Sequence, residues 1–234
     1  RIKAMREIKA SASGFTIGAA VSGMELGEHK QLCKAWPGVV EATQLIGSDQ
    51  IQGRCTMVGN LCNASPAADS VPAMIAADAK AVIVGKKGKR SIPVEKVCTG
   101  PGATSLAKSE VIEAITLPKR PAKSGDAYLR FIPRTEMDIA VVSAAVSLTT
   151  KGGVISTARV VLGAVAPTAI LVPKAAKAII GTKLDKAALE ALAAACSAAC
   201  KPIDDKRGTI EYRTQVAGVL AKRAAAIALK RAGG

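Results

Sequence analysis

Aromatic side chains are scarce in this sequence, which has two Phe, two Tyr and one Trp in 234 residues. Proteins that bind single-stranded nucleic acid usually stack bases on clustered aromatic rings, and these five rings are scattered along the chain. The scarcity therefore argues against a nucleic-acid partner, although the net charge of +15 would attract polyanions. The core must instead be built mainly from Ala, Val, Ile and Leu.

Residues that bind metals or act as nucleophiles are also few. There is one histidine, and the six cysteines include no C-x-x-C pair, so we predict no metal site in this chain. No Ser/His/Asp arrangement or P-loop is present, so no catalytic side chain is predicted. No apolar run approaches the about 20 residues of a membrane-spanning helix, and irregularly spaced cysteines are typical of a reducing compartment. We expect a cytoplasmic protein without a membrane span.

The chain divides into two halves of different design. The segment 118–126 (PKRPAKSGD) is rich in proline and charge and is typical of a linker. Apolar runs between turn signals predict strands, and three-to-four-residue periodicity predicts helices. The expected strands are 14–21, 81–84, one ending at 117, 128–132, 139–148 and 155–165. The expected helices are segments of 24–46 that are interrupted at Pro37 and Gly38, followed by 71–78, 173–180, 185–201 and 212–231. The sequence thus predicts an α+β protein with domains 1–126 and 127–234.

Two turns are predicted from charged sequences. The basic run 85–90 (GKKGKR) is expected at the tip of a hairpin, and Asp204 and Asp205 are expected in a capped turn before the last helix.

The segment 51–69 (IQGRCTMVGNLCNASPAAD) is the most informative part of the chain. Its Gly, Asn, Ser and Pro residues are typical of a backbone that turns repeatedly and exposes its amides. Gly59 lies among small polar side chains, so a phosphate could approach the backbone N–H groups there, and Asp69 could accept hydrogen bonds from hydroxyls. These residues alone leave open whether the segment is a ligand loop or an ordinary series of turns.

The T-x-x-G-N element followed by NASPAAD resembles the FAD-binding loop of the flavoprotein subunits of molybdenum hydroxylases, which include carbon monoxide dehydrogenases and xanthine dehydrogenases. Three motifs of the second half resemble the C-terminal domain of the same family, in the family's order. They are YLRFIPRTEMDIAVVSAAVSL, ARVVLGAVAPT and DDKRGTIEYRTQVAGVL. The resemblance implies a p-cresol methylhydroxylase-type FAD-binding domain. A small domain of antiparallel sheet and helices would follow it, with FAD between the two.

The resemblance assigns eight residues to FAD: Ile46, Thr56, Gly59, Asn60, Asn63, Asp69, Ile112 and Arg130. By position in the motif, Thr56, Gly59 and Asn60 would hold the pyrophosphate. The side chains of Asn63 and Asp69 would contact phosphate or the hydroxyls of ribitol and ribose.

The remaining three residues are assigned to the isoalloxazine ring. Ile46 and Ile112 would form apolar walls, and Arg130 would stabilise negative charge on the ring. From the residues alone, Arg130 could also be a solvated charge at a strand edge.

The sequence departs from the family pattern in two ways. Val58 stands where the family usually has the first of two consecutive glycines, so a β-branched residue occupies a position that often needs backbone freedom. The family's first phosphate loop belongs to an N-terminal subdomain that is expected to precede residue 1. We therefore expect a partial FAD-binding domain in residues 1–126.

The function implied by the resemblance is that of an FAD-dependent oxidoreductase subunit. Substrate would be oxidised at a molybdopterin cofactor in a large partner subunit, and electrons would pass through [2Fe-2S] clusters in a small partner subunit. FAD in this chain would deliver them to an external acceptor, for which NAD, a quinone and oxygen all remain open. The alternative is a flavin-free structural or assembly subunit of such a complex.

Overall fold

The computed structural model describes residues 2–233 and has a five-stranded antiparallel sheet in the first half, in the order β1-β2-β7-β3-β4. The strands are β1 (Ile8–Ser11), β2 (Gly14–Gly18), β3 (Lys80–Gly85), β4 (Gly88–Pro93) and β7 (Val111–Pro118). The helices of this half are α1 (Gly23–Glu28), α2 (Lys30–Ala35), α3 (Pro37–Gln44), α4 (Asp49–Gln52), α5 (Met57–Cys62) and α6 (Ser70–Ala76). Smaller elements are the 3-10 turns η1 (Lys3–Arg6) and η2 (Val94–Lys96) and the pair β5 (Cys98–Gly100) and β6 (Ala103–Thr104).

Local sequence explains several of these elements. Pro37 begins α3, where its missing N–H costs nothing, and this confirms the predicted interruption of the helical segment. The predicted basic hairpin tip is also confirmed, because Gly85 pairs with Gly88 where β3 turns into β4. The segment 51–69 was expected to be irregular, and that prediction was wrong in part, since it contains α5 and the end of α4.

The second half is a four-stranded antiparallel sheet in the order β11-β10-β9-β8. Its strands are β8 (Ser124–Phe131), β9 (Val142–Lys151), β10 (Val154–Gly163) and β11 (Ile170–Leu171). The helices are α7 (Pro173–Ile179), α8 (Lys186–Ala199) and α9 (Ile210–Arg231). The predicted strands and helices of this half are confirmed with shifted ends, and the α+β class is confirmed for the chain.

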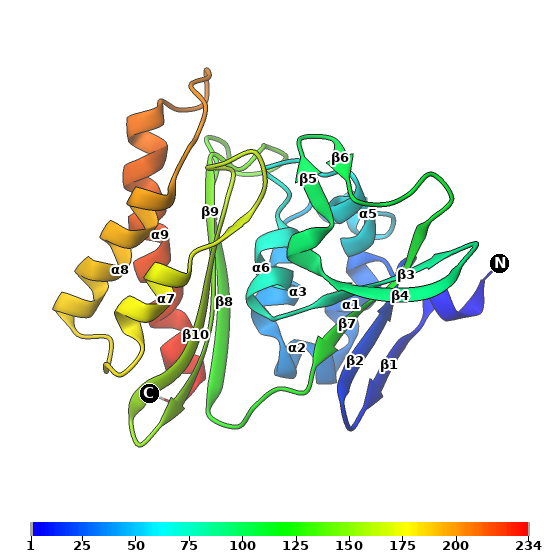
Figure 1. Cartoon of the computed structure of the whole chain (residues 1–234), viewed down its shortest axis with the longest axis horizontal. Helices are drawn as coiled ribbons and strands as arrows, with labels where there is room; N and C mark the ends of the chain where they lie inside the picture. The colour runs from blue at the N-terminus through cyan, green and yellow to red at the C-terminus, as the bar shows by residue number, and fades with distance from the viewer. Residues whose placement is uncertain (1, 234) are drawn as a thin grey trace.

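The two sheets and their helices form layers, as Figure 1 shows. Helices α7 to α9 cover one face of the second sheet, and α3 and α6 of the first half lie between its other face and the first sheet. Tyr128, Ala145 and Val161 of the second sheet pack into the core of the first half, while Val146 and Leu162 pack under the helices. Both faces of this sheet are therefore covered along most of its length, which accounts for apolar runs such as 144–146 in β9 and 160–162 in β10.

Small residues allow these layers to approach closely. Gly125 on β8 lies against α9, and a Cβ added there would overlap the carbonyl oxygen of Ala228. Because β8 begins at Ser124, the last residues of the predicted linker belong to the strand and are largely buried. Within residues 2–233, the structure contains no helix with both the length and the apolar character needed to cross a membrane.

Candidate functional site

The segment predicted to hold a phosphate begins helix α5. The Thr56 side chain accepts a hydrogen bond from the backbone N–H of Gly59 at 2.8 Å, which is the standard N-cap arrangement. Gly59 is exposed, and a Cβ added there would meet only Thr56 Oγ1, at 3.0 Å, so the outer side of this turn is open. Val58 points into the core, with 8% of its surface exposed, and its backbone does not require the positive φ that favours glycine. Val58 therefore does not distort the turn.

Asn60 connects α5 to α6. Its Oδ1 accepts hydrogen bonds from the backbone N–H of Ser70 at 3.1 Å and from the Ser70 hydroxyl at 2.7 Å. The amide side chain thus satisfies a donor in the first turn of α6. The backbone N–H of Asn60 donates to the Thr56 carbonyl at 3.0 Å, so the predicted phosphate contact of Asn60 would have to come from its amide nitrogen.

Asp69 and Arg130 are brought together although 61 positions separate them. Arg130 Nη1 donates to Asp69 Oδ2 at 2.7 Å, and the Tyr128 hydroxyl donates to Asp69 Oδ1 at 2.8 Å. Asp69 immediately precedes α6, while Tyr128 and Arg130 are alternate residues of β8, so this cluster joins the two halves of the chain. Arg130 is not the solvated edge charge that the sequence left open, because only 8% of its side chain is exposed.

The electrostatics of this cluster are those of a buried ion pair. Burial raises the pKa of Asp69 above its ordinary value, and the charge of Arg130 and the hydrogen bonds from Tyr128 and Arg130 act in the opposite direction. Burial also raises the pKa of Tyr128 well above its usual range, so its hydroxyl remains a donor at neutral pH. The cluster therefore fixes the Arg130 guanidinium at the boundary between the two halves, with its charge balanced by Asp69.

The other three predicted residues lie on separate elements. Asn63 is exposed at the C-terminal end of α5. Ile46 is half-buried after α3, and its carbonyl accepts from Gln52 Nε2 at 2.6 Å. Ile112 lies in β7 opposite Ile83 and is buried in the core of the first half. Their assignments to the cofactor remain predictions.

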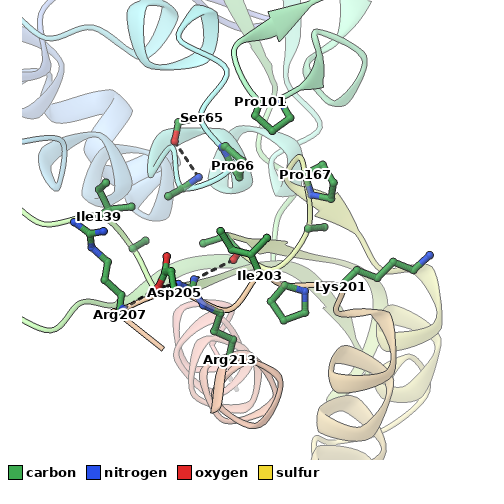
Figure 2. Close-up of a pocket in the computed structure, with 15 residues that line it drawn as sticks. Ser65, Pro66, Pro101, Ile139, Pro167, Lys201, Ile203, Asp205, Arg207 and Arg213 are labelled. Carbon is green, nitrogen blue, oxygen red and sulfur yellow. Dashed lines mark hydrogen bonds and ion pairs between the residues drawn. The ribbon is translucent and has the colours of Figure 1, made fainter. Parts of the chain in front are cut away.

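A cavity of about 330 Å³ lies beside this region, between residues that follow α5 and loops of the second half. Ser65, Pro66 and Pro101 face Ile139 and Ile203 across it in Figure 2. Its walls are mostly apolar. These lining residues come from distant parts of the sequence, so no local pattern could have predicted the cavity.

Arg213 and Asp205 close the base of this cavity. Arg213 is buried and donates to the carbonyl of Val141 and to Asp205 Oδ1, both at 2.7 Å. Asp204 accepts from the N–H of Ile210 at 2.9 Å, which confirms the predicted capped turn before α9. No role was predicted for Tyr128 or Arg213, and the only signal that the sequence offered was that both lie within the motifs that indicated the family.

Comparison with known proteins agrees with the predicted family. Residues 1–120 match the family described as the FAD binding domain in molybdopterin dehydrogenase, and residues 127–228 match the CO dehydrogenase flavoprotein C-terminal domain. The chain is 32% identical to the carbon monoxide dehydrogenase medium chain of Hydrogenophaga pseudoflava over 96% of its own length and 78% of that protein. It is 34% identical to the corresponding medium chain of Afipia carboxidovorans, with the same coverage of both chains.

The fold of this chain also matches solved structures of related proteins. A chain of reconstituted CO dehydrogenase from Oligotropha carboxidovorans superposes with a TM-score of 0.94 and 32% identity, covering 98% of this chain and 80% of that chain. Quinoline 2-oxidoreductase from Pseudomonas putida 86, at 24% identity and a TM-score of 0.90, shares the fold. The chain therefore belongs to the family of FAD-binding medium subunits of the molybdenum hydroxylases.

Proposed function

We propose that this chain is the subunit of a molybdenum hydroxylase complex that passes electrons from the iron–sulfur clusters of a small partner subunit to an external acceptor. Substrate oxidation would take place at the molybdopterin cofactor of a large partner subunit. The observation that carries the proposal is the Asp69–Arg130 pair, which places one buried cation at the end of the NASPAAD segment. Two relatives of this chain are named carbon monoxide dehydrogenase medium chains.

The residues present fit FAD at the α5 turn. Gly59 leaves the outer side of the turn open, and the first N–H groups of a helix are donors suited to phosphate. Thr56 and Asn60 fix the turn through their hydrogen bonds to Gly59 and Ser70. In the proposal, the backbone at 56–60 takes the pyrophosphate, and the side chain of Asn63, exposed at the end of α5, reaches phosphate or ribitol.

The remaining assigned residues, which come from both halves of the chain, would supply charge and apolar walls around the isoalloxazine ring. Arg130 would hold a positive charge beside the isoalloxazine ring, and Asp69 would keep that guanidinium in place while its remaining lone pairs accept from sugar hydroxyls. Ile46 and Ile112 are proposed as apolar walls. When bound, FAD supplies redox chemistry that needs no nucleophile or general base from the protein, which agrees with the lack of a catalytic triad in the sequence.

A second candidate function is a flavin-free structural or assembly subunit. It is favoured by one specific observation, namely that the side chains of Asn60 and Asp69 already have partners within the protein. Under this alternative the two domains would serve only to dock partner subunits.

The test is the composition of the complex recovered from its own cell with an affinity tag on this chain. We expect about one FAD per chain, together with molybdenum and iron–sulfur partners. Recovery of the partners without flavin would support the structural alternative, and recovery of neither would contradict both functions.

A pair of variants makes this test specific for the α5 turn. Gly59→Glu places a carboxylate where the pyrophosphate is proposed to lie, and it should lose FAD while keeping its partners. Gly100→Glu is the matched control, because a Cβ added there meets no atom within 4 Å. If Gly59→Glu retained FAD as well as Gly100→Glu, the proposed phosphate site would be wrong.

A further inference from the structure

Tyr128 was not among the residues that the sequence assigned to the cofactor, yet it contacts one of them directly. It lies in β8 beside α6 (Figure 1), is 3% exposed, and its hydroxyl is 2.8 Å from Asp69 Oδ1. A tyrosine in an otherwise apolar sheet core is unusual, because a buried hydroxyl needs a hydrogen-bond partner. Here the partner is the carboxylate that holds Arg130.

Tyr128 and Arg130 act on the same carboxylate from the same strand. They are two positions apart in β8, so their side chains leave the same face of the sheet. Tyr128 bonds to Oδ1 and Arg130 bonds to Oδ2, so the two donors fix both oxygens of Asp69. The orientation of the carboxylate plane is thereby determined.

The neighbouring strand supports Tyr128 in turn. Ser143 on β9 lies opposite Arg130 and is 1% exposed. Burial is the main cause that raises the pKa of Tyr128, and a hydrogen bond with the Ser143 hydroxyl acts in the opposite direction. Gly163 of β10 faces Ser143, and a Cβ there would overlap the Ser143 hydroxyl. The absence of a side chain at Gly163 thus leaves room for Ser143.

We infer that Tyr128 is a positioning residue, which orients Asp69 so that Asp69 holds the Arg130 guanidinium at one fixed place beside the cofactor. This inference rests on the proposed function, in which Arg130 faces FAD. An arginine side chain has several rotatable bonds, and a single carboxylate oxygen leaves it free to swing about that contact. With Oδ1 held by Tyr128, the ion pair has one orientation.

The position of the Arg130 guanidinium also depends on both halves of the chain. Asp69 belongs to the first half, and Tyr128, Ser143 and Arg130 belong to the second. The guanidinium is therefore placed correctly only when the two halves are packed together, which would couple cofactor binding to their packing.

The experiment compares FAD binding by the purified full chain and its Tyr128→Phe variant, measured by quenching of free FAD fluorescence. Phenylalanine keeps the buried ring and removes only the hydroxyl. We expect the dissociation constant to rise about tenfold, as for the loss of one hydrogen bond to a buried charge. The visible absorption bands of bound FAD should shift in the same direction as in Arg130→Gln, which a purely structural role of Tyr128 would not cause.

Tyr212→Phe is the matched control, because that tyrosine is 40% exposed and lies on α9. It should bind FAD within about twofold of the wild type.

The double variant Tyr128→Phe with Arg130→Gln decides whether Tyr128 acts through Arg130. If it does, the double variant binds FAD no more weakly than Arg130→Gln alone. Wild-type affinity in Tyr128→Phe, or effects that multiply in the double variant, would overturn the inference. Failure of the wild-type chain to bind FAD would instead contradict the proposed function, and that result is visible before any variants are compared.

Discussion

The buried pair of Asp69 and Arg130 makes a quantitative prediction for the variant Arg130→Met. The exposed fractions of the two side chains are 10% and 8%. Removing one partner of such a pair typically costs about 3 to 5 kcal/mol, because the other charge remains buried. Methionine keeps most of the packing of the arginine stem, and Tyr128 still donates to Asp69. We therefore expect a loss of about 3 kcal/mol at neutral pH, or roughly 6 to 12 °C in melting temperature for a chain of this size.

The loss should depend on pH with a definite sign. Burial raises the pKa of Asp69, and Arg130 counteracts that rise, so removing Arg130 raises the pKa further. A carboxyl whose pKa is higher in the folded state loses stability as the pH rises from its unfolded pKa through its folded one. The difference in unfolding free energy between wild type and Arg130→Met should therefore be small near about pH 4 and grow toward about pH 7.

Urea unfolding at the two pH values measures this difference. Lys89→Met is the control, because Lys89 forms an ion pair with Glu113 but is 62% exposed, and such pairs contribute about 1 kcal/mol or less. The reasoning would be refuted if Arg130→Met unfolded within about 1 kcal/mol of the wild type at neutral pH, or if its loss were the same at both pH values.

Three further predictions concern packing, thiols and the α5 turn. Gly125→Ala should lower the unfolding free energy by about 2 kcal/mol or more, because the new methyl group overlaps the backbone of α9. Gly100→Ala is the control and should leave thermal unfolding nearly unchanged, because its methyl group meets no atom within 4 Å. Iodoacetamide should label Cys62, which is exposed in the native protein, but not Cys196, which is fully buried. Burial also raises the pKa of the Cys196 thiol to about 12, which disfavours the reactive thiolate. Peptide mass spectrometry that finds Cys196 labelled in the native protein would contradict the structure. Thr56→Val removes the side-chain cap of α5 and should lower the stability of this helix by about 1 kcal/mol. Hydrogen exchange at the Gly59 amide should then become faster. An unchanged exchange rate would show that the cap has no effect.

The sequence predicted the second half of the fold well, for a physical reason. β9 and β10 contain apolar runs and are joined by a glycine turn at 151–153, and α8 and α9 are long and rich in alanine. Signals of this kind are local, so they need no knowledge of tertiary contacts. The family was also predictable, because three motifs occur in order along that half, and the comparisons confirm it.

Helix α5 was not predicted because its sequence is a weak helix former. It contains Gly59 and Asn60, which favour turns in isolation. The helix forms because Met57 and Leu61 are buried on one face and Thr56 caps the first turn. Tertiary packing thus outweighed local propensity.

The cluster around Asp69 illustrates a second limit. The motifs suggested Asp69 and Arg130 as separate ligand contacts, but their mutual contact spans 61 positions and depends on how β8 packs beside α6. Tyr128 begins one of the motifs that indicated the family, but that motif assigns it no role. Alternation along β8 places it on the same face as Arg130 only once the strand is known. Contacts between distant segments follow from topology rather than from local pattern.

Electron transfer through this subunit is tested most directly by anaerobic spectroscopy of the tagged complex. The complex is first reduced with limiting dithionite and then mixed with NAD, a soluble quinone or oxygen, while absorption near the flavin band is recorded. We expect one acceptor to restore the flavin band and the iron–sulfur absorption together, and a complex depleted of FAD to remain reduced with that acceptor. Equally fast reoxidation of the FAD-depleted complex would show that electrons leave by another route and would contradict the proposed function.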